Sequence, residues 1–298
     1  PTTAGEVTFG VDLTGFSTRV TQDGSSWNDG DKIGTYVLDM KTLEPVTEAA
    51  NVPYVCSEEG ASVSFTSTTP LKVQNDGTPV KFVAYYPYNA DVRNFNYPVQ
   101  LAAQERGSTA CDLLYAATKE EYTYSPENEP HISLNFTHRL AKVILKFVNM
   151  EKEPLEVSDV RIEGMQTAAS FNIQTDVLTV DESSVATINP YHNATTGFYE
   201  AIILPSALTD SYKVSFVLDD REKEWIFTNL DIALPQFHKG YSYTFALYID
   251  DSGFVEMGRL ENVEGGNSSA PWEDGSSEDG TAEGDKTPVS GYAFTPAD

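Results

Sequence analysis

The stretch from residue 131 to residue 148 constrains the fold of this chain more than any other part of the sequence. Apolar side chains alternate with smaller or polar ones from Ile132 to Leu140, which is the period of a strand with one buried face. After Ala141 and Lys142 the apolar positions fall on the other parity. Because a slip of one residue turns every later side chain to the opposite face, the chain either contains a β-bulge here or passes from one sheet to another. We expect a passage between two sandwiches in or just before this stretch.

The charge of the chain excludes two classes of partner. Its 45 acidic and 19 basic residues give a formal net charge of -26, which repels both a nucleic-acid backbone and an anionic lipid surface. The sequence contains no apolar run of about eighteen residues and no basic segment ahead of an apolar stretch. We therefore expect no nucleic-acid partner, no transmembrane segment and no signal peptide in the given chain.

Alternating apolar residues between turn residues predict an all-β protein. Tyr, Phe, Thr and Val are abundant, and these residue types favour strands. No amphipathic helix of convincing length is visible in the sequence. Residues 212–227 are expected to form a hairpin with a charged loop at Asp219 to Glu224. The other clear strands are expected at residues 7–13, 33–38, 61–67, 80–86, 112–116, 157–165, 169–173, 197–204 and 241–249.

The expected boundary divides the chain into three parts. At 298 residues with 40% hydrophobic content, the chain is long enough for two packed domains. We expect an amino-terminal β-sandwich domain over residues 1–134 and a carboxy-terminal β-sandwich domain over residues 135–263. From residue 264 the sequence is rich in Gly, Ser and acidic residues, which bury too little apolar area to become ordered. Residues 264–298 are therefore expected to form a flexible tail.

Motifs that carry chemistry are missing from the sequence. It has no nucleophile elbow, no phosphate-binding glycine loop and no pair of histidines at metal-ligand spacing. The acidic cluster at Asn28, Asp29 and Asp31 lacks the regular oxygen spacing of a calcium loop. His138 stands on the apolar parity of its strand and is expected to be a core side chain near the domain junction. We expect no enzyme, no catalytic residue, no metal and no cofactor.

Two pairs of residues leave alternatives open. Cys56 and Cys111 could form one disulfide, although two buried thiols are the preferred interpretation for so few cysteines. Tyr85 and Tyr86 could offer aromatic faces to a carbohydrate, which would make the protein a glycan-binding surface module. Packing at the rim of a sandwich is the more ordinary role for such tyrosines.

The amino-terminal strand stands out because it is short and lies close to the end of the chain. Val7, Phe9, Val11 and Leu13 alternate with small or polar residues, and such a terminal strand is easily displaced. Arg19 is the only basic residue among the first thirty, so it is the one target there for a trypsin-like protease. By its chemistry alone, Arg19 would otherwise be an ordinary solvated arginine.

Six segments follow one another along the chain: WNDGDKIGTYVL, KFVAYYPY, DLLYA, SLNFTHRLAKVILKF, KGYSYTFALYIDDSGF and PWEDG. The most diagnostic piece is the motif F-T-H-x-L-A-K that ends at Lys142 and is followed by alternating apolar residues. Taken in this order, the segments resemble the fimbrillin-like family of type V pilus subunits and related surface lipoproteins of anaerobic Gram-negative bacteria.

The resemblance implies two transthyretin-like β-sandwich domains in tandem and a structural role in a fimbrium or as a cell-surface adhesin. It implies a lipoprotein that is exported through the periplasm to the outer membrane and cell surface. The implied partners are other pilus subunits and a ligand on a host or bacterial surface. The implied assembly is donor-strand exchange, in which a protease removes the amino-terminal strand and a strand of the next subunit replaces it.

On this sequence, the resemblance maps the removable strand to Val7, Phe9, Val11 and Leu13 and the processing site to Arg19. No cysteine that could accept a lipid stands near the amino terminus, so we expect the given chain to be a mature or trimmed form. The acidic tail after Trp272 continues beyond the usual family ending.

Overall fold

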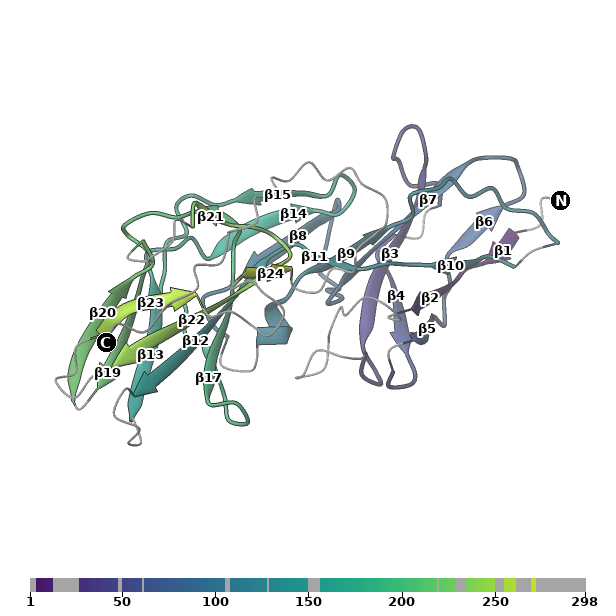
Figure 1. Cartoon of the computed structure of the whole chain (residues 1–298). Coiled ribbons are helices and arrows are strands. Elements are labelled where there is room, and N and C mark those ends of the chain that lie inside the picture. Colours follow the sequence, from purple (N-terminus) through teal and green to yellow (C-terminus); the bar gives the residue numbers. More distant parts are fainter. Residues whose placement is uncertain are drawn as a thin grey trace.

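The computed structural model describes residues 4–12, 27–47, 50–60, 62–104, 108–127, 129–149, 156–218, 220–228, 234–249, 255–260 and 269–271. Over these residues the protein is all-β, apart from one 3-10 turn, η1 (Ser108–Cys111). The molecule is elongated, with strands of the first half of the chain gathered at one end and those of the second half at the other (Figure 1).

The first half forms an eight-stranded sheet in the order β10-β2-β5-β4-β3-β7-β9-β11. Neighbouring strands are antiparallel except for β10 and β2, which run parallel. A short strand, β1 (Ala4–Glu6), pairs with β6 (Lys72–Gln74) beside this sheet. The strands of the large sheet are β2 (Thr8–Asp12), β3 (Lys32–Asp39), β4 (Val52–Cys56), β5 (Ser62–Thr66), β7 (Val80–Tyr86), β9 (Leu114–Ala117), β10 (His131–Ser133) and β11 (Thr137–His138).

The second half builds two facing sheets. A six-stranded sheet has the order β16-β17-β12-β22-β23, with β24 also paired to β22, and a three-stranded sheet has the order β13-β19-β20. A small pair, β18 (Ser206–Ala207) and β21 (Gln236–Phe237), completes this half. The strands of the two sheets are β12 (Ala141–Asn149), β13 (Val157–Glu163), β16 (Tyr191–Asn193), β17 (Phe198–Ile203), β19 (Lys213–Leu218), β20 (Arg221–Ile226), β22 (Tyr241–Ile249), β23 (Val255–Leu260) and β24 (Ser269–Pro271).

Three clusters of buried hydrophobic side chains lie between these layers. The first core fills the inside of the eight-stranded sheet, and the second core lies between the two facing sheets of the second half. The third core packs on the opposite face of β3 and β7, where it includes Tyr36, Val83 and Tyr85. Its cover is a three-stranded sheet made of β8 (Asn96–Gln100), β14 (Ala168–Asn172) and β15 (Val177–Val180). Because β8 pairs with β14, this sheet takes strands from both halves of the chain.

The stretch from 131 to 149 changes sheets where its alternation slips. Thr137–His138 still pair with β9 of the eight-stranded sheet, whereas Ala141 begins β12 of the six-stranded sheet. The expected passage from one sheet to another is therefore confirmed, and no bulge is needed. His138 is buried near this passage, with its Nδ1 atom 2.8 Å from Oδ2 of Asp112. The domain boundary at residue 134 stays a prediction.

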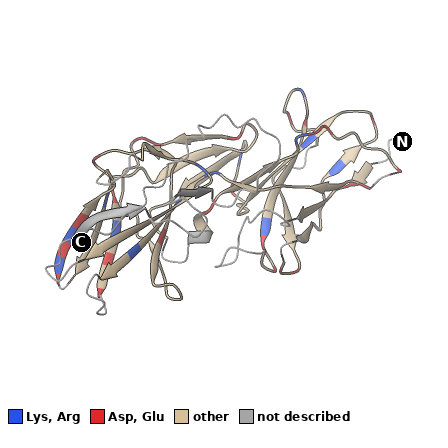
Figure 2. Ribbon diagram, viewed as in Figure 1, with Lys and Arg blue, Asp and Glu red and all other residues tan. Residues whose placement is uncertain are grey.

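Two expectations about loops need correction. In the hairpin expected at residues 212–227, Arg221 to Glu224 are not in the loop, because they already pair with β19 as part of β20. Their charges suit an edge strand, where they discourage pairing with other chains; Figure 2 shows acidic and basic residues side by side there. In the expected tail, Ser269–Pro271 pair with Tyr241–Tyr243 of β22, so these three residues are not free.

A buried glutamine links the two halves. Gln104 is 1% exposed, and its Nε2 atom donates to the carbonyl oxygens of Leu101 and Ile202 at 2.8 and 2.7 Å. Its Oε1 atom accepts a hydrogen bond from the Ile202 main-chain nitrogen at 2.8 Å. One side chain from the first half thus satisfies both main-chain groups of a residue in β17.

Replacing Gln104 by Met should lower the free energy of unfolding by about 1–3 kcal/mol, because Ile202 would keep a buried donor and acceptor without this partner. Methionine preserves the length and most of the volume of the side chain. Urea denaturation of Gln104→Met and of Gln100→Met, whose side chain is exposed, would test this. Equal midpoints for the two variants would contradict the proposed role of the amide.

Candidate functional site

The described residues offer no constellation for catalysis by a metal. Among them, no group of three or more His, Cys, Asp or Glu side chains could hold an ion. The carboxylate of Asp31 instead accepts hydrogen bonds from the Asn28 main-chain nitrogen at 2.7 Å and from the Tyr86 hydroxyl at 3.3 Å. Among the same described residues, no helix has the length and hydropathy that crossing a bilayer requires.

The place of the amino-terminal strand is the most distinctive site in the fold. Although β2 comes near the start of the described chain, it is not an edge strand, because it lies between β10 and β5. Phe9 is opposite Ile132 in the parallel pair and opposite Phe65 in the antiparallel pair. This strand therefore satisfies the main-chain groups of two neighbours at once.

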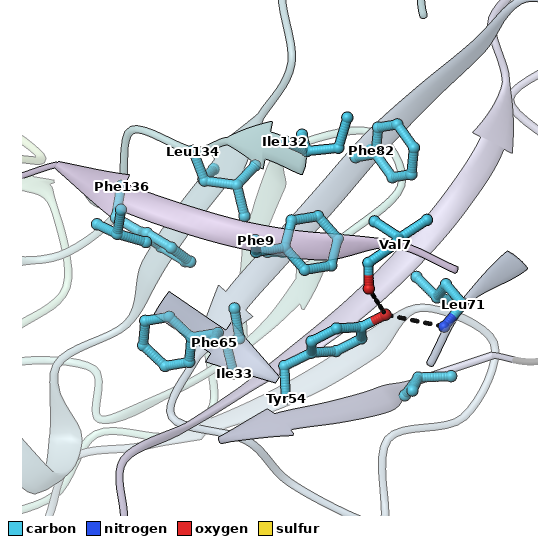
Figure 3. Close-up of a cluster of buried hydrophobic side chains, with 14 of the residues drawn as sticks. Val7, Phe9, Ile33, Tyr54, Phe65, Leu71, Phe82, Ile132, Leu134 and Phe136 are labelled. Atoms are coloured by element: carbon cyan, nitrogen blue, oxygen red, sulfur yellow. Dashed lines mark hydrogen bonds between the residues drawn. The ribbon is translucent and has the colours of Figure 1, made fainter. Parts of the chain in front are cut away.

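The side chains of the strand enter the first core, as the sequence pattern predicts. Val7 and Phe9 are 0% exposed and Val11 is 2% exposed. Phe9 packs edge-on against Tyr54 and Phe82, with ring centroids 4.8 and 5.8 Å apart (Figure 3). Full burial of a side chain of this size contributes about 1.5–3 kcal/mol, so these three residues supply much of what holds the strand in place.

Main-chain hydrogen bonds extend beyond the regular pairs at both ends of the strand. The Val7 nitrogen donates to the carbonyl of Leu71, and the Thr8 nitrogen donates to the carbonyl of Pro130, each at 2.9 Å. The Gly10 carbonyl accepts from the Leu134 nitrogen, also at 2.9 Å. At the outer end, Glu6 forms an ion pair with Lys72 at 3.3 Å, between two largely exposed side chains.

Tyr54 connects the strand to the wall of the core. Its hydroxyl donates to the carbonyl oxygen of Val7 at 2.9 Å and accepts from the nitrogen of Leu71 at 2.8 Å (Figure 3). The side chain is 0% exposed, and burial raises the pKa of the hydroxyl from 10.0 to about 12. The hydroxyl therefore stays protonated, and able to donate to Val7, throughout the physiological range.

If this strand left, the arrangement would become a slot. The edges of β10 and β5 would both lose their partners, and the pockets of Val7, Phe9 and Val11 would open to water. Unpaired main-chain groups and exposed apolar surface both favour the binding of another strand. Such a slot would suit an extended strand that carries apolar side chains at alternate positions.

The remaining residues singled out by the sequence fall in different places. Leu13 and Arg19 lie outside the described residues. Tyr85 does not face solvent: it is 0% exposed, and its hydroxyl donates to Oδ1 of Asn51 at 2.6 Å. Tyr86 is half-buried, and burial raises the pKa of its hydroxyl, which bonds Asp31. With Tyr85 inside the third core, this pair cannot form an open stacking surface for a glycan.

The two cysteines are both free thiols, so the disulfide alternative does not apply in this structure. Cys56 is buried in the first core, and its Sγ atom donates to the carbonyl of Glu58 at 2.8 Å. Cys111 is only half-buried at the end of η1, so the expectation of two buried thiols holds for Cys56 alone.

Sequence reasoning missed two parts of the site. Tyr54 was not singled out, because Pro53 interrupts the alternation of β4 and conceals its buried positions, Val52, Tyr54 and Cys56. The parallel pairing of β10 with β2 joins residues more than a hundred positions apart, and short-range patterns do not report such pairing.

Comparison with known proteins agrees on one family and one fold. A family model described as fimbrillin-like matches residues 18–272. A candidate cell adhesion protein from Bacteroides uniformis has a similar structure, with a TM-score of 0.70, 22% identity, and coverage of 91% of this chain and 98% of its own. A protein of the same description from Bacteroides ovatus gives a TM-score of 0.62 at 16% identity, over 86% and 96% of the two chains. No curated protein sequence matches the chain.

Replacing Tyr54 by Phe should lower the free energy of unfolding at neutral pH by about 1–3 kcal/mol, because Val7 and Leu71 lose their shared hydrogen-bond partner. The amino-terminal strand should be held less firmly as a result. The raised pKa of Tyr54 means that its stabilising contribution is complete below pH 10 and is lost as the pH rises toward about 12. The difference in unfolding free energy between wild type and Tyr54→Phe should therefore shrink over this interval.

The matched control is Tyr243→Phe, in the second core. The Tyr243 hydroxyl also accepts from a main-chain nitrogen, that of His238 at 2.8 Å, and burial raises its pKa to about 12 as well. Both variants should be less stable, but only Tyr54→Phe should speed hydrogen exchange at residues 4–12. A difference that stays constant from neutral to strongly alkaline pH would contradict the role given to the Tyr54 hydroxyl.

Proposed function

Since the chain belongs to the fimbrillin-like family, we propose that it is a structural fimbrial subunit or a surface adhesin that assembles by donor-strand exchange at the place of β2. The observation that carries the exchange is the two-sided pairing of β2 within the first core. A subunit that gives up this strand must accept another, because an empty slot exposes two sheet edges and several apolar pockets. The acceptor is therefore part of the fold, and only the identity of its occupant changes.

In this proposal a protease cuts the chain after Arg19, in the segment between β2 and Trp27. The cut releases β2 from the covalent constraint that keeps it close to its slot. Trp27 then remains as a fixed point on the body side, since it is 0% exposed and packs edge-on against Phe65 and Phe136. A strand from the next subunit takes the place of the released one, with similar main-chain bonds, so the exchange proceeds with little net change in pairing.

The proposed architecture is a pair of transthyretin-like β-sandwich domains in tandem, divided near residue 134. The passage of the chain between sheets at residues 138–141 supports this division. The sheet shared by β8 and β14, with the third core beneath it, fastens the two domains together. In a polymer, a subunit built in this way would be stiff where its two domains meet and would not bend there.

The proposed location follows from the family and the assembly. The chain would be exported through the periplasm and displayed at the outer membrane or in a fimbrium, with a lipid anchor in its precursor. Its partners would be other subunits and a ligand on a host or bacterial surface, and its role would be architectural or adhesive rather than enzymatic.

Trypsin under native conditions should cleave the full chain after Arg19 without unfolding the body, because the buried strand remains bound until another strand displaces it. On longer incubation the cut protein should form oligomers linked through β2 slots. Size-exclusion chromatography and mass spectrometry would follow both steps. An excess of a synthetic peptide with the sequence of residues 4–12 should block oligomer formation.

The control is Arg19→Gln, which should stay uncut at this position and monomeric under the same conditions. A cut protein that loses residues 1–19 and remains a folded monomer would refute exchange through this slot. Oligomers that form equally well from Arg19→Gln would show that assembly uses another surface.

A further inference from the structure

Two glycines near the amino terminus, Gly5 in β1 and Gly10 in β2, lie directly beneath side chains of one neighbouring segment. A Cβ atom added to Gly5 would be 2.4 Å from Cε2 of Tyr124 and 3.1 Å from Cδ of Pro130. A Cβ atom added to Gly10 would be 2.7 Å from Nε2 of His131. Contacts below about 3 Å between such atoms do not occur without a shift, so a side chain at either position requires the overlying ring to move.

Backbone freedom is not the reason for these glycines. Neither of them has a positive φ, unlike Gly30, Gly77 and Gly164. Alanine could therefore adopt the same backbone conformation, and in a strand it would lose less conformational entropy than glycine. Steric room beneath Tyr124 and His131 is the remaining physical reason for glycine at these positions.

The same segment also bonds the strand directly. The carbonyl of Pro130 accepts from the Thr8 nitrogen at 2.9 Å, and Nδ1 of His131 lies 3.0 Å from the Thr8 hydroxyl. If His131 rotated away to admit a side chain at position 10, its contact with Thr8 would be lost. Tyr124 has less freedom, because it is half-buried and packs against the first core.

The segment holds the strand from both faces. Burial alternates from residue 4 to residue 11, so Gly5 shares a parity with Val7 and Phe9, whereas Gly10 shares the opposite parity with Thr8. Tyr124 therefore covers the core-facing side of the strand and His131 covers its outer side. A strand that slipped by one or two residues would place a side chain under at least one of these rings.

We propose that Tyr124, Pro130 and His131 form a strap that admits only a strand with glycine at both covered positions. This inference rests on the proposed strand exchange and specifies the partner. The incoming strand carries two glycines five residues apart, and between and beyond them it carries apolar side chains at the positions of Val7, Phe9 and Val11. The strap thereby selects both the sequence of the incoming strand and its register. The apolar pockets alone do not fix these two properties.

The first test uses the intact full-length chain and needs no exchange. Gly10→Ala should speed hydrogen exchange at residues 4–12 about tenfold, and adding His131→Ala should restore most of the protection. Gly5→Ala should behave in the same way with Tyr124→Ala. The crossed pairs, Gly10→Ala with Tyr124→Ala and Gly5→Ala with His131→Ala, are matched controls and should show no rescue.

The second test uses the full chain cut after Arg19, with its own strand still bound. A labelled peptide AGEVTFGVD, the sequence of residues 4–12, competes for the slot against AAEVTFAVD, which has alanine at both glycine positions. The glycine peptide should be incorporated at least about tenfold more readily, and this preference should fall on protein with both Tyr124→Ala and His131→Ala.

The outcomes of the two tests distinguish a failure of the glycine rule from a failure of the proposed strand exchange. Equal incorporation of the two peptides, or rescue by crossed pairs as strong as by matched pairs, would overturn the glycine rule. If the matched pairs couple but neither peptide enters the slot, strand exchange itself is refuted, and with it the rule for a partner. Coupling in the matched pairs together with selective uptake of the glycine peptide would support both.

Discussion

The main-chain pairing of β2 with both β5 and β10 is the constraint on which the first half of the structure depends. A strand at the edge of a sheet leaves one row of donors and acceptors behind when it departs, but β2 would leave two. The same residues bring Val7, Phe9 and Val11 into the first core, so pairing and packing are lost together. The Tyr54 hydroxyl adds a polar contact inside that core, between Val7 and Leu71.

A second constraint joins the halves of the molecule. The faces of β3 and β7 are both covered, by the first core on one side and the third core on the other. This double burial explains why Tyr85, on the face away from the first core, is not available to solvent. Around the same junction, Arg139 forms an ion pair with Asp176 at 2.5 Å and lies 4.9 Å from the centre of the Tyr115 ring. These contacts tie the passage between the two sheets to loops and strands of both halves.

Local pattern in the sequence predicted the burial of Val7 and Phe9 and the change of sheet before Ala141, because alternation reports which side chains share a face. It did not predict partners, since pairing of residues far apart depends on the whole topology. It also failed where both faces of a strand are buried, as at Tyr85, because alternation then carries no information about exposure. A glycine within an alternating pattern weakens the prediction of a strand, yet Gly5 and Gly10 lie in strands, at places where another segment approaches closely. Only coordinates distinguish these two meanings of glycine.

The sheet shared by β8, β14 and β15 has a mechanical consequence. Its strands run along the long axis of the molecule, between the two groups of strands that form the ends (Figure 1). Tension applied from end to end therefore loads the β8 and β14 pair in shear, so that its hydrogen bonds resist together instead of opening one after another. The side chain of Gln104 adds two hydrogen bonds between the halves, both to the main chain of Ile202. A pull along this axis that moved the two halves apart would have to break these hydrogen bonds together.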